Sequence, residues 1–263
     1  MARIAIITGA ASGIGQALAT ALVARGDTVV VADIDGDGAG RVAGELARQG
    51  PGAATPAVVD VRDAGAVQAL VDQTRDDHDR VGRVHPVHAA YPVMVEQGSG
   101  HIVNTASLAG LLPSPGLTPY AMTKHAVVGL SLSLRLEAAA NGVRVTAVCP
   151  GVVDTPILDK GGPDDLPKPA LSGHAREFFR HYQPRFYSPD RLAQDVVRGI
   201  DRNAALVVAP ASARVAWYLW RYAPLVVNQM AARQLAWARA TFPARPAGRT
   251  DARVSASRRD GPG

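Results

Sequence analysis

The chain has 263 residues, of which 47% are hydrophobic, so it is long enough for one large α/β domain or two small ones with a sizeable core. Its formal net charge of +5 is uneven, because ten arginines and only three aspartates lie between Asp201 and the C-terminus. This charge is not interleaved with base-stacking aromatics, so we interpret it as a solvated basic segment and expect no nucleic-acid partner.

The single cysteine, Cys149, excludes an internal disulfide and suits a reducing compartment. The N-terminus has no signal-peptide pattern, and no window of about 20 residues is free of charge. We therefore expect a cytoplasmic protein with no transmembrane segment.

The first element is a short apolar run at residues 4–7, which is typical of a strand buried on both faces of a parallel sheet. It leads into a glycine-rich turn and then a helical pattern from Gln16 to Arg25. Such a turn can receive a pyrophosphate on its backbone N–H groups and on the helix dipole. The candidate cofactor-binding residues are Gly9, Ser12, Gly13, Ile14 and Gly15. The alternative is a tight turn that binds no ligand.

The second strand is expected at residues 28–32, and Asp33 follows it directly, 18 residues after Gly15. In a dinucleotide-binding unit, a carboxylate at this position accepts hydrogen bonds from the adenosine ribose and repels a 2′-phosphate. Asp33 therefore favours NAD over NADP. The alternative is that Asp33 is a turn or cap residue.

Further elements follow in an alternating βα order that predicts a parallel sheet. The helices are expected at residues 39–49, 64–77 and 188–203, and the strands at residues 57–59, 102–105, 143–148 and 205–209. A segment rich in glycine, proline and charge, residues 157–187, has the composition of a mobile lid.

Ser107 follows the strand at residues 102–105, and Tyr120 and Lys124 lie four residues apart just beyond it. Thr118 is the expected N-cap of a helix with Pro119 as its first residue, which puts Tyr120 and Lys124 on one helical face. An adjacent ammonium lowers the pKa of a phenol and makes it apt for proton transfer. Because any two residues recur at this spacing by chance, an ordinary helix face is the alternative.

Together these motifs resemble the short-chain dehydrogenase/reductase family: the Thr8–Gly15 turn, Asp33, the Asp60-Val61 turn, Ser107, and Tyr120 with Lys124. The segment from Cys149 to Thr155 resembles the family loop that contacts nicotinamide, through Pro150, Gly151, Val153 and Thr155. The resemblance implies that Asp60 and Val61 contact adenine. It also implies that Tyr120 is the general acid–base, that Ser107 binds the substrate oxygen and that Lys124 holds the nicotinamide ribose.

The resemblance also implies the architecture, a single α/β domain with a Rossmann-like doubly wound parallel sheet over residues 1–242. Family members are commonly dimers or tetramers, so we expect a homo-oligomer. Residues 243–263 read as a disordered basic tail.

One departure from the family concerns the fourth strand. The family carries an Asn-Asn-Ala-Gly segment there and an active-site asparagine on the next helix, yet this chain has no asparagine between Asp60 and Ile102. The simplest interpretation is an internal deletion. Pro86, within the replacement segment Val81–His88, lacks the N–H that a central strand needs, so we expect a distorted or missing fourth strand. His85 and His88 lack ligand companions at metal-binding spacing, so we interpret them as surface or loop residues and expect no metal.

The C-terminal quarter contains an aromatic-rich region at residues 215–240, beside Arg214 and Arg221. Two interpretations stay open: packing against the lid or a partner subunit, or a helix on a membrane surface.

The resulting hypothesis is an NAD-dependent oxidoreductase that moves a hydride between a small apolar secondary alcohol or ketone and nicotinamide. The alternative is a catalytically impaired or non-enzymatic nucleotide-binding relative, because of the deletion.

Overall fold

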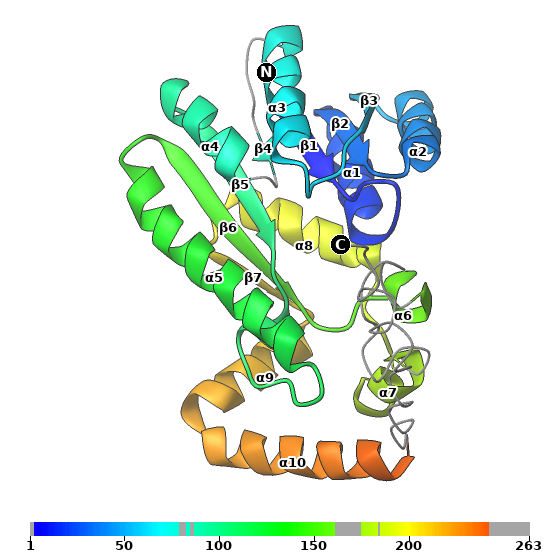
Figure 1. Cartoon of the computed structure of the whole chain (residues 1–263), viewed down its shortest axis with the longest axis vertical. Helices are drawn as coiled ribbons and strands as arrows, with labels where there is room; N and C mark the ends of the chain where they lie inside the picture. Colours follow the sequence, from blue (N-terminus) through cyan, green and yellow to red (C-terminus); the bar gives the residue numbers. More distant parts are fainter. Residues whose placement is uncertain (1–2, 79–82, 85–86, 161–174, 184, 242–263) are drawn as a thin grey trace, which may run out of the picture.

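The computed structural model describes residues 3–78, 83–84, 87–160, 175–183 and 185–241. Its strands form one parallel sheet of seven, in the order β3-β2-β1-β4-β5-β6-β7, as expected for a doubly wound α/β fold (Figure 1). The strands are β1 Ile4–Thr8, β2 Thr28–Asp33, β3 Ala53–Val58, β4 Arg83–Val84, β5 Gly100–Thr105, β6 Val143–Pro150 and β7 Leu206–Ala209. The helices are α1 Gly13–Ala24, α2 Gly36–Gln49, α3 Ala64–His78, α4 Val87–Glu96, α5 Thr118–Ala139, α6 Ile157–Lys160, α7 Ala175–Tyr182, α8 Pro189–Asp201, α9 Ala211–Tyr222 and α10 Pro224–Thr241, with a 3-10 turn η1 at Leu108–Gly110.

Helices cover both faces of the sheet, because neighbouring residues of a central strand point to opposite sides. Ile7 belongs to a buried cluster with residues of α1, α2 and α8. Ile6, 1% exposed, belongs to a second cluster with residues of α3, α4 and α5. Burial on both faces explains why β1 is a continuous apolar run.

The fourth strand is present, and its described part consists of Arg83 and Val84. It lies between β1 and β5, paired through Ala5 with Arg83 on one side and through His101 and Ile102 on the other. By contrast, β5 and β6 pair over six positions. The expectation of a degenerate fourth strand is confirmed, while His85, Pro86 and residues 79–82 lie outside the described residues. His88 is exposed in α4.

Several expected boundaries were wrong by a few residues; α1 begins at Gly13 rather than Gln16, and α2 begins at Gly36 rather than at residue 39. The third strand was expected at residues 57–59, but β3 begins at Ala53 and includes Pro56. Since β3 is the edge strand, it is largely exposed and tolerates a proline, so it lacks the apolar run that marks a central strand. Helix α5 has Leu117 as its N-cap, one residue before the expected Thr118. Tyr120 and Lys124 still occupy its first two turns.

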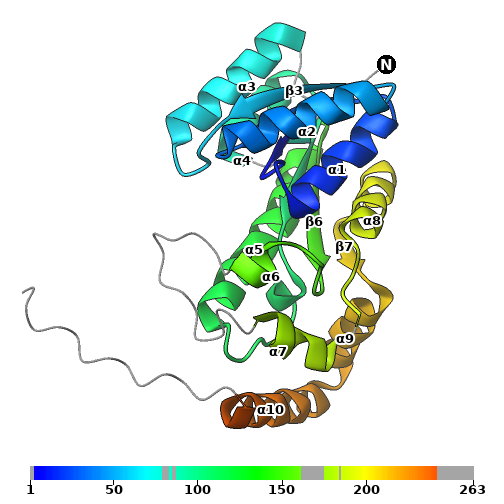
Figure 2. The same ribbon diagram turned by 90° about the vertical axis from the view of Figure 1, so that its right-hand side faces the viewer.

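We call α9 and α10 together, residues 211–241, the C-terminal arm. Both views place α10 at the end of the molecule opposite α2 and α3 (Figures 1 and 2). Trp237 of α10 stacks on His181 of α7, with 3.9 Å between ring centroids. The arm therefore packs against the segment expected to form the lid. The tail at residues 243–263 and residues 161–174 of the expected lid lie outside the described residues. Among the helices that the structure describes, none combines the length and apolar content of a membrane span.

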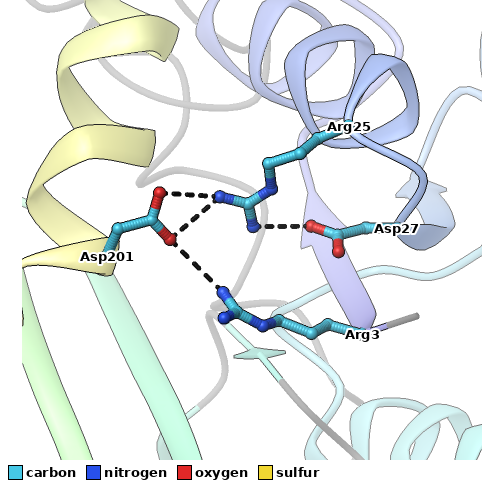
Figure 3. Close-up of polar contacts among 4 residues, drawn as sticks. All are labelled: Arg3, Arg25, Asp27 and Asp201. Carbon is cyan, nitrogen blue, oxygen red and sulfur yellow. Dashed lines mark hydrogen bonds and ion pairs between the residues drawn. The ribbon is translucent and has the colours of Figure 1, made fainter. Parts of the chain in front are cut away.

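An ion network ties α1 to α8 at the amino edge of the sheet (Figure 3). Arg25, at the C-cap of α1, contacts Asp201 through Nη1 at 2.9 Å and Asp27 through Nη2 at 2.8 Å. Arg3 adds a contact to Asp201 at 3.3 Å. Partial burial raises the pKa of Asp201, but Arg25 and Arg3 outweigh it, and the net pKa lies below the ordinary 3.8.

This network generates a stability prediction. Arg25→Gln should lower the free energy of unfolding by about 1–3 kcal/mol, because the charged hydrogen bonds to Asp201 and Asp27 are lost and Asp27 is largely buried. Arg3→Gln, which removes one exposed contact to the same carboxylate, should cost less than about 1 kcal/mol. Urea denaturation of both variants measures the difference, and equal costs would contradict the role given to Arg25.

The network should also depend on pH in a defined direction. Because the folded-state pKa of Asp201 is lowered, its contribution is fully present above 3.8 and is lost as pH falls through the lowered value. The stability gap between Arg25→Gln and the unchanged protein should therefore shrink on acidification. Urea denaturation at neutral pH and at about pH 3 tests this, and a constant gap would count against it.

Candidate active site

The predicted site residues lie at the carboxyl edge of the sheet, in the segments that follow β1, β2, β3, β5 and β6. Ligands of open α/β sheets bind at this edge, because the strand ends and helix N-termini meet there.

The turn after β1 has the backbone that its glycines permit. Gly9 and Gly13 have positive φ values of 68° and 57°, which favour glycine. A Cβ on Gly15 would lie 2.2 Å from the Gly9 oxygen, so the turn closes tightly on α1. Ser12 is the extended N-cap of α1, and its side chain makes no capping bond to any residue that the structure describes. Ile14 packs against the core cluster of α1, α2 and α8.

Asp33 is tied to this turn. Its Oδ2 accepts a hydrogen bond from the Ala11 N–H at 2.9 Å, and its Oδ1 accepts one from the Asp35 N–H at 3.1 Å. Asp35, rather than Asp33, caps α2 by accepting from Gly38 at 3.0 Å. A carboxylate has about four acceptor sites, so Asp33 retains capacity for ribose hydroxyls.

Asp60 and Val61 follow β3 as a short exposed turn. Asp60 accepts the Arg62 side chain at 2.8 and 3.0 Å and the Arg62 N–H at 2.9 Å. The side-chain bonds from Arg62 lower the pKa of Asp60. Val61 is 58% exposed and leaves an apolar surface on this turn.

Lys124 connects α5 to the strand that leads into Ser107. Its Nζ donates to the Thr105 carbonyl at 3.0 Å and lies 5.5 Å from the centroid of the Tyr120 ring. Tyr120 is 44% exposed, so its phenol is open to a bound molecule. Ser107 is the N-cap of η1, and its Oγ accepts the Ala109 N–H at 3.1 Å. Lys124 therefore links the face of α5 that bears Tyr120 to the end of β5, which precedes Ser107.

Burial shapes the electrostatics beneath this junction. Desolvation lowers the pKa of Lys124, against a smaller opposing effect of Cys149. Desolvation raises the pKa of the Cys149 thiol to about 12, although the Ser107 N–H and Lys124 act in the other direction. Cys149 thus stays a neutral thiol near pH 7, where it is neither a counter-charge for Lys124 nor a nucleophile.

Gly110 was missed by the sequence reasoning. A Cβ at this buried position would lie 2.5 Å from the Lys124 carbonyl oxygen, so only glycine lets η1 rest directly on α5. This close approach holds the Ser107 segment beside the helix that carries Tyr120 and Lys124. The glycine was the one signal of this contact in the sequence. Its neighbour on α5 is brought to it by the tertiary fold, so the local sequence does not reveal it.

The loop after β6 reaches across to the turn after β1. Thr155 is 8% exposed and packs against Gly13, where an added Cβ would lie 3.3 Å from the Thr155 Cγ2. Pro150 ends β6, and the Gly151 N–H donates to Ala209 at 2.8 Å. Val153 forms a bridge with Tyr187, which ties the loop to the chain beyond α7. The predicted cofactor residues of the two sheet halves are therefore brought together at Gly13 and Thr155.

Arg176 of α7 was also missed. Its guanidinium contacts Asp159 at 2.6 and 2.7 Å and Asp154 at 2.8 Å. The hydrogen bonds to Asp159 and Asp154 raise the pKa of Arg176. These residues, together with Thr155 and Pro156, line a cavity of about 330 Å³ beside the loop after β6.

The sequence and the fold of the chain are similar to those of known proteins. A model of the short chain dehydrogenase family matches residues 3–83 and 81–165. A probable oxidoreductase of Mycobacterium tuberculosis, EphD, is 32% identical over 240 residues, covering 78% of this chain and 40% of that protein. The 4-formylbenzenesulfonate dehydrogenase of Comamonas testosteroni is 35% identical over 227 residues, covering 74% of this chain and 88% of that protein. A short chain dehydrogenase/reductase from Burkholderia phymatum, solved in complex with NAD, has a TM-score of 0.74 and 25% identity, covering 84% of this chain and 93% of that one.

The close packing of η1 on α5 generates a testable prediction. Gly110→Ala should lower the free energy of unfolding by about 1–3 kcal/mol, because its Cβ meets the α5 backbone. Gly129→Ala, on the same helix and with no atom within 4 Å of the added Cβ, should be neutral or stabilising by up to about 1 kcal/mol. Denaturant unfolding of both variants measures this, and equal effects would mean that η1 does not rest on α5.

Proposed function

The chain belongs to the short-chain dehydrogenase family, and from that premise we propose that it is an NAD-dependent oxidoreductase acting on a small apolar secondary alcohol or ketone. The observation that carries the proposal is the junction at Lys124, which contacts the Tyr120 ring and the carbonyl of Thr105, two residues before Ser107. The chain spans only 40% of the length of EphD, and the activity of this chain is argued from its own residues.

The residues at the carboxyl edge fit a nicotinamide dinucleotide. The space over Gly9 is open, since an added Cβ there meets nothing within 4 Å, and the first turn of α1 presents N–H groups that no helical carbonyl satisfies. Gly9, Ser12, Gly13, Ile14 and Gly15 would hold the pyrophosphate, and Asp33 the adenosine ribose. Asp60 and Val61 would contact the adenine. On the nicotinamide side, the contacts would come from Pro150, Gly151, Val153 and Thr155. The complex of a solved relative with NAD supports this class of cofactor.

Each catalytic residue then has a proposed role. When bound, the nicotinamide supplies the hydride acceptor or donor. In the oxidative direction the substrate hydroxyl gives its proton to Tyr120, and in the reductive direction Tyr120 returns it. The Ser107 hydroxyl donates a hydrogen bond to the substrate oxygen. Lys124 holds the nicotinamide ribose and stabilises the anionic form of Tyr120 by its charge.

A second candidate function follows from what surrounds Lys124. The family resemblance implied an active-site asparagine on the helix after the fourth strand, but no asparagine lies between Asp60 and Ile102. The Lys124 ammonium contacts the Thr105 carbonyl instead. The two segments matched by the family model meet at residues 81–83, where we propose the internal deletion. A catalytically impaired, nucleotide-binding relative is therefore the alternative.

Exposed apolar residues of α5 support the proposed homo-oligomer. Met122 is 68% exposed, Leu130 is 51% exposed and Leu136 is 79% exposed, and contact with a second subunit would remove such side chains from water.

The two functions differ in one measurement. Tyr120→Phe should keep NAD affinity but lower kcat on secondary alcohols about 10²–10⁴-fold, because the proton acceptor is lost. Tyr222→Phe, which removes a hydroxyl from an exposed tyrosine of α9, should leave kcat unchanged. Calorimetry with NAD and assays over a panel of secondary alcohols and ketones provide the data. Binding of NAD without turnover in the unchanged protein would favour the impaired relative.

Cofactor choice gives a further prediction. Asp33→Asn should shift the affinity ratio from NAD towards NADP by about tenfold or more, because a neutral amide no longer repels a 2′-phosphate. Asp37→Asn removes the same charge from the exposed first turn of α2 and should leave the ratio unchanged. Fluorescence titration with both dinucleotides measures the ratio, and an equal shift in the two variants would point to net charge rather than to Asp33.

A further inference from the structure

Helix α9 has an apolar outer face. Val215 is 58% exposed, Tyr218 is 51% exposed, Leu219 is 43% exposed and Tyr222 is 79% exposed. Their spacing of three, four and seven residues from Val215 places them on one side of the helix. Tyr218 stacks against both Trp217 and Tyr222, with ring centroids 5.1 and 6.4 Å apart. The outer face is therefore an ordered aromatic and aliphatic surface.

The inner face of α9 is apolar as well. Ala213 is 4% exposed, and Trp217 packs against a buried cluster formed with β6, β7 and α5. An ordinary surface helix buries one apolar stripe and presents polar residues to water. Helix α9 departs from that pattern, because Ala213 and Trp217 already pack it against the protein while its outer face is apolar as well.

The first turns of α10 also expose apolar side chains. Leu225 is 76% exposed, Val226 is 50% exposed and Met230 is 51% exposed. Near its other end α10 packs on α7, where Trp237 stacks on His181. The arm lies at one end of the long axis of the molecule (Figures 1 and 2). Its outer face can therefore contact a broad surface before the sheet and the helices that cover it do.

The charge of the C-terminal segment indicates which kind of surface the arm binds. Residues 202–250 contain seven arginines and no aspartate or glutamate, and four of these arginines, Arg214, Arg221, Arg233 and Arg239, belong to the arm. Tyrosine and tryptophan beside arginine and aliphatic residues favour the boundary between lipid headgroups and acyl chains. We propose that the C-terminal arm docks on the surface of an anionic lipid bilayer through Val215, Tyr218, Leu219, Tyr222 and Leu225.

The same charge argues against the outer faces of two arms packing together. Pairing two copies would bring four arginines from each arm to one interface with no carboxylate from either arm to balance them. Anionic headgroups remove that repulsion and attract the arginines instead.

The test is sedimentation of the full chain with vesicles of about 30% phosphatidylglycerol in phosphatidylcholine. The double substitution Tyr222→Ser and Leu225→Ser should weaken partitioning about tenfold or more, because both side chains leave water on docking. Ile34→Ser with Val58→Ser removes two side chains of 61% and 73% exposure from the other end of the molecule and should leave partitioning unchanged. Equal partitioning of both double variants and the unchanged protein would overturn the proposal.

A charge test is independent of the apolar one. Arg221→Gln with Arg233→Gln should weaken partitioning about tenfold to thirtyfold, and raising salt should weaken it in the unchanged protein. Unchanged binding after these substitutions, or after replacing the anionic lipid with phosphatidylcholine alone, would overturn the proposal.

The alternative partner of the outer face, a second copy of the chain, is tested by a separate measurement. If Tyr222→Ser with Leu225→Ser instead changed the molar mass measured by light scattering and left vesicle binding intact, the outer face would be an interface between copies and the proposal would be wrong. Normal thermal unfolding of the variant confirms that a loss of vesicle binding does not reflect a loss of folding.

Discussion

The site depends on keeping two half-sheets in position across β4. Strands β1, β2 and β3 carry the glycine turn and Asp33, whereas β5 and β6 lead into Ser107 and the Thr155 loop. In the described part of the sheet, β4 joins these halves through Ala5 with Arg83 and through two pairs with β5. A sheet relies on its ladder to fix strand positions. Contacts outside this described part of the ladder also fix the relative position of the halves.

Three sets of contacts span this junction. Ala5 and Ile7 of β1 share a buried cluster with Val103 of β5, Val148 of β6 and Leu192 of α8. At the amino edge, the Arg25 guanidinium holds Asp201, so the end of α1 is tied to the end of α8. At the carboxyl edge, Thr155 packs on Gly13. Apolar burial supplies most of the stabilising free energy of such contacts, and the polar contacts favour one relative orientation of the elements. The two halves are thus joined in the core, at the amino edge and at the carboxyl edge of the sheet.

Local patterns in the sequence predicted most of the elements and their order, because buried parallel strands and amphipathic helices have distinct periodicities. The glycine turn, Asp33 and the Tyr120–Lys124 spacing needed only neighbours in the chain. Pro56 hid the start of β3, since its tolerance depends on an edge position. Gly110, Arg176 and the Thr105 carbonyl could not be predicted, because their partners come from other elements. The apolar outer face of α9 was visible as aromatic content, but which side chains are buried is decided by the tertiary fold.

The tie between α1 and α8 has a consequence for the order of folding. Arg25 and Asp201 are 176 residues apart, so their contact closes nearly the longest loop that the fold contains in its described part. Chains are made from the N-terminus, and early segments begin to fold before later ones exist. Leu22 and Val23 of α1 belong to the cluster that includes Leu192 and Ile200, yet they are synthesised long before these α8 residues. The half-sheet that leaves the ribosome first is therefore the one whose core is completed late.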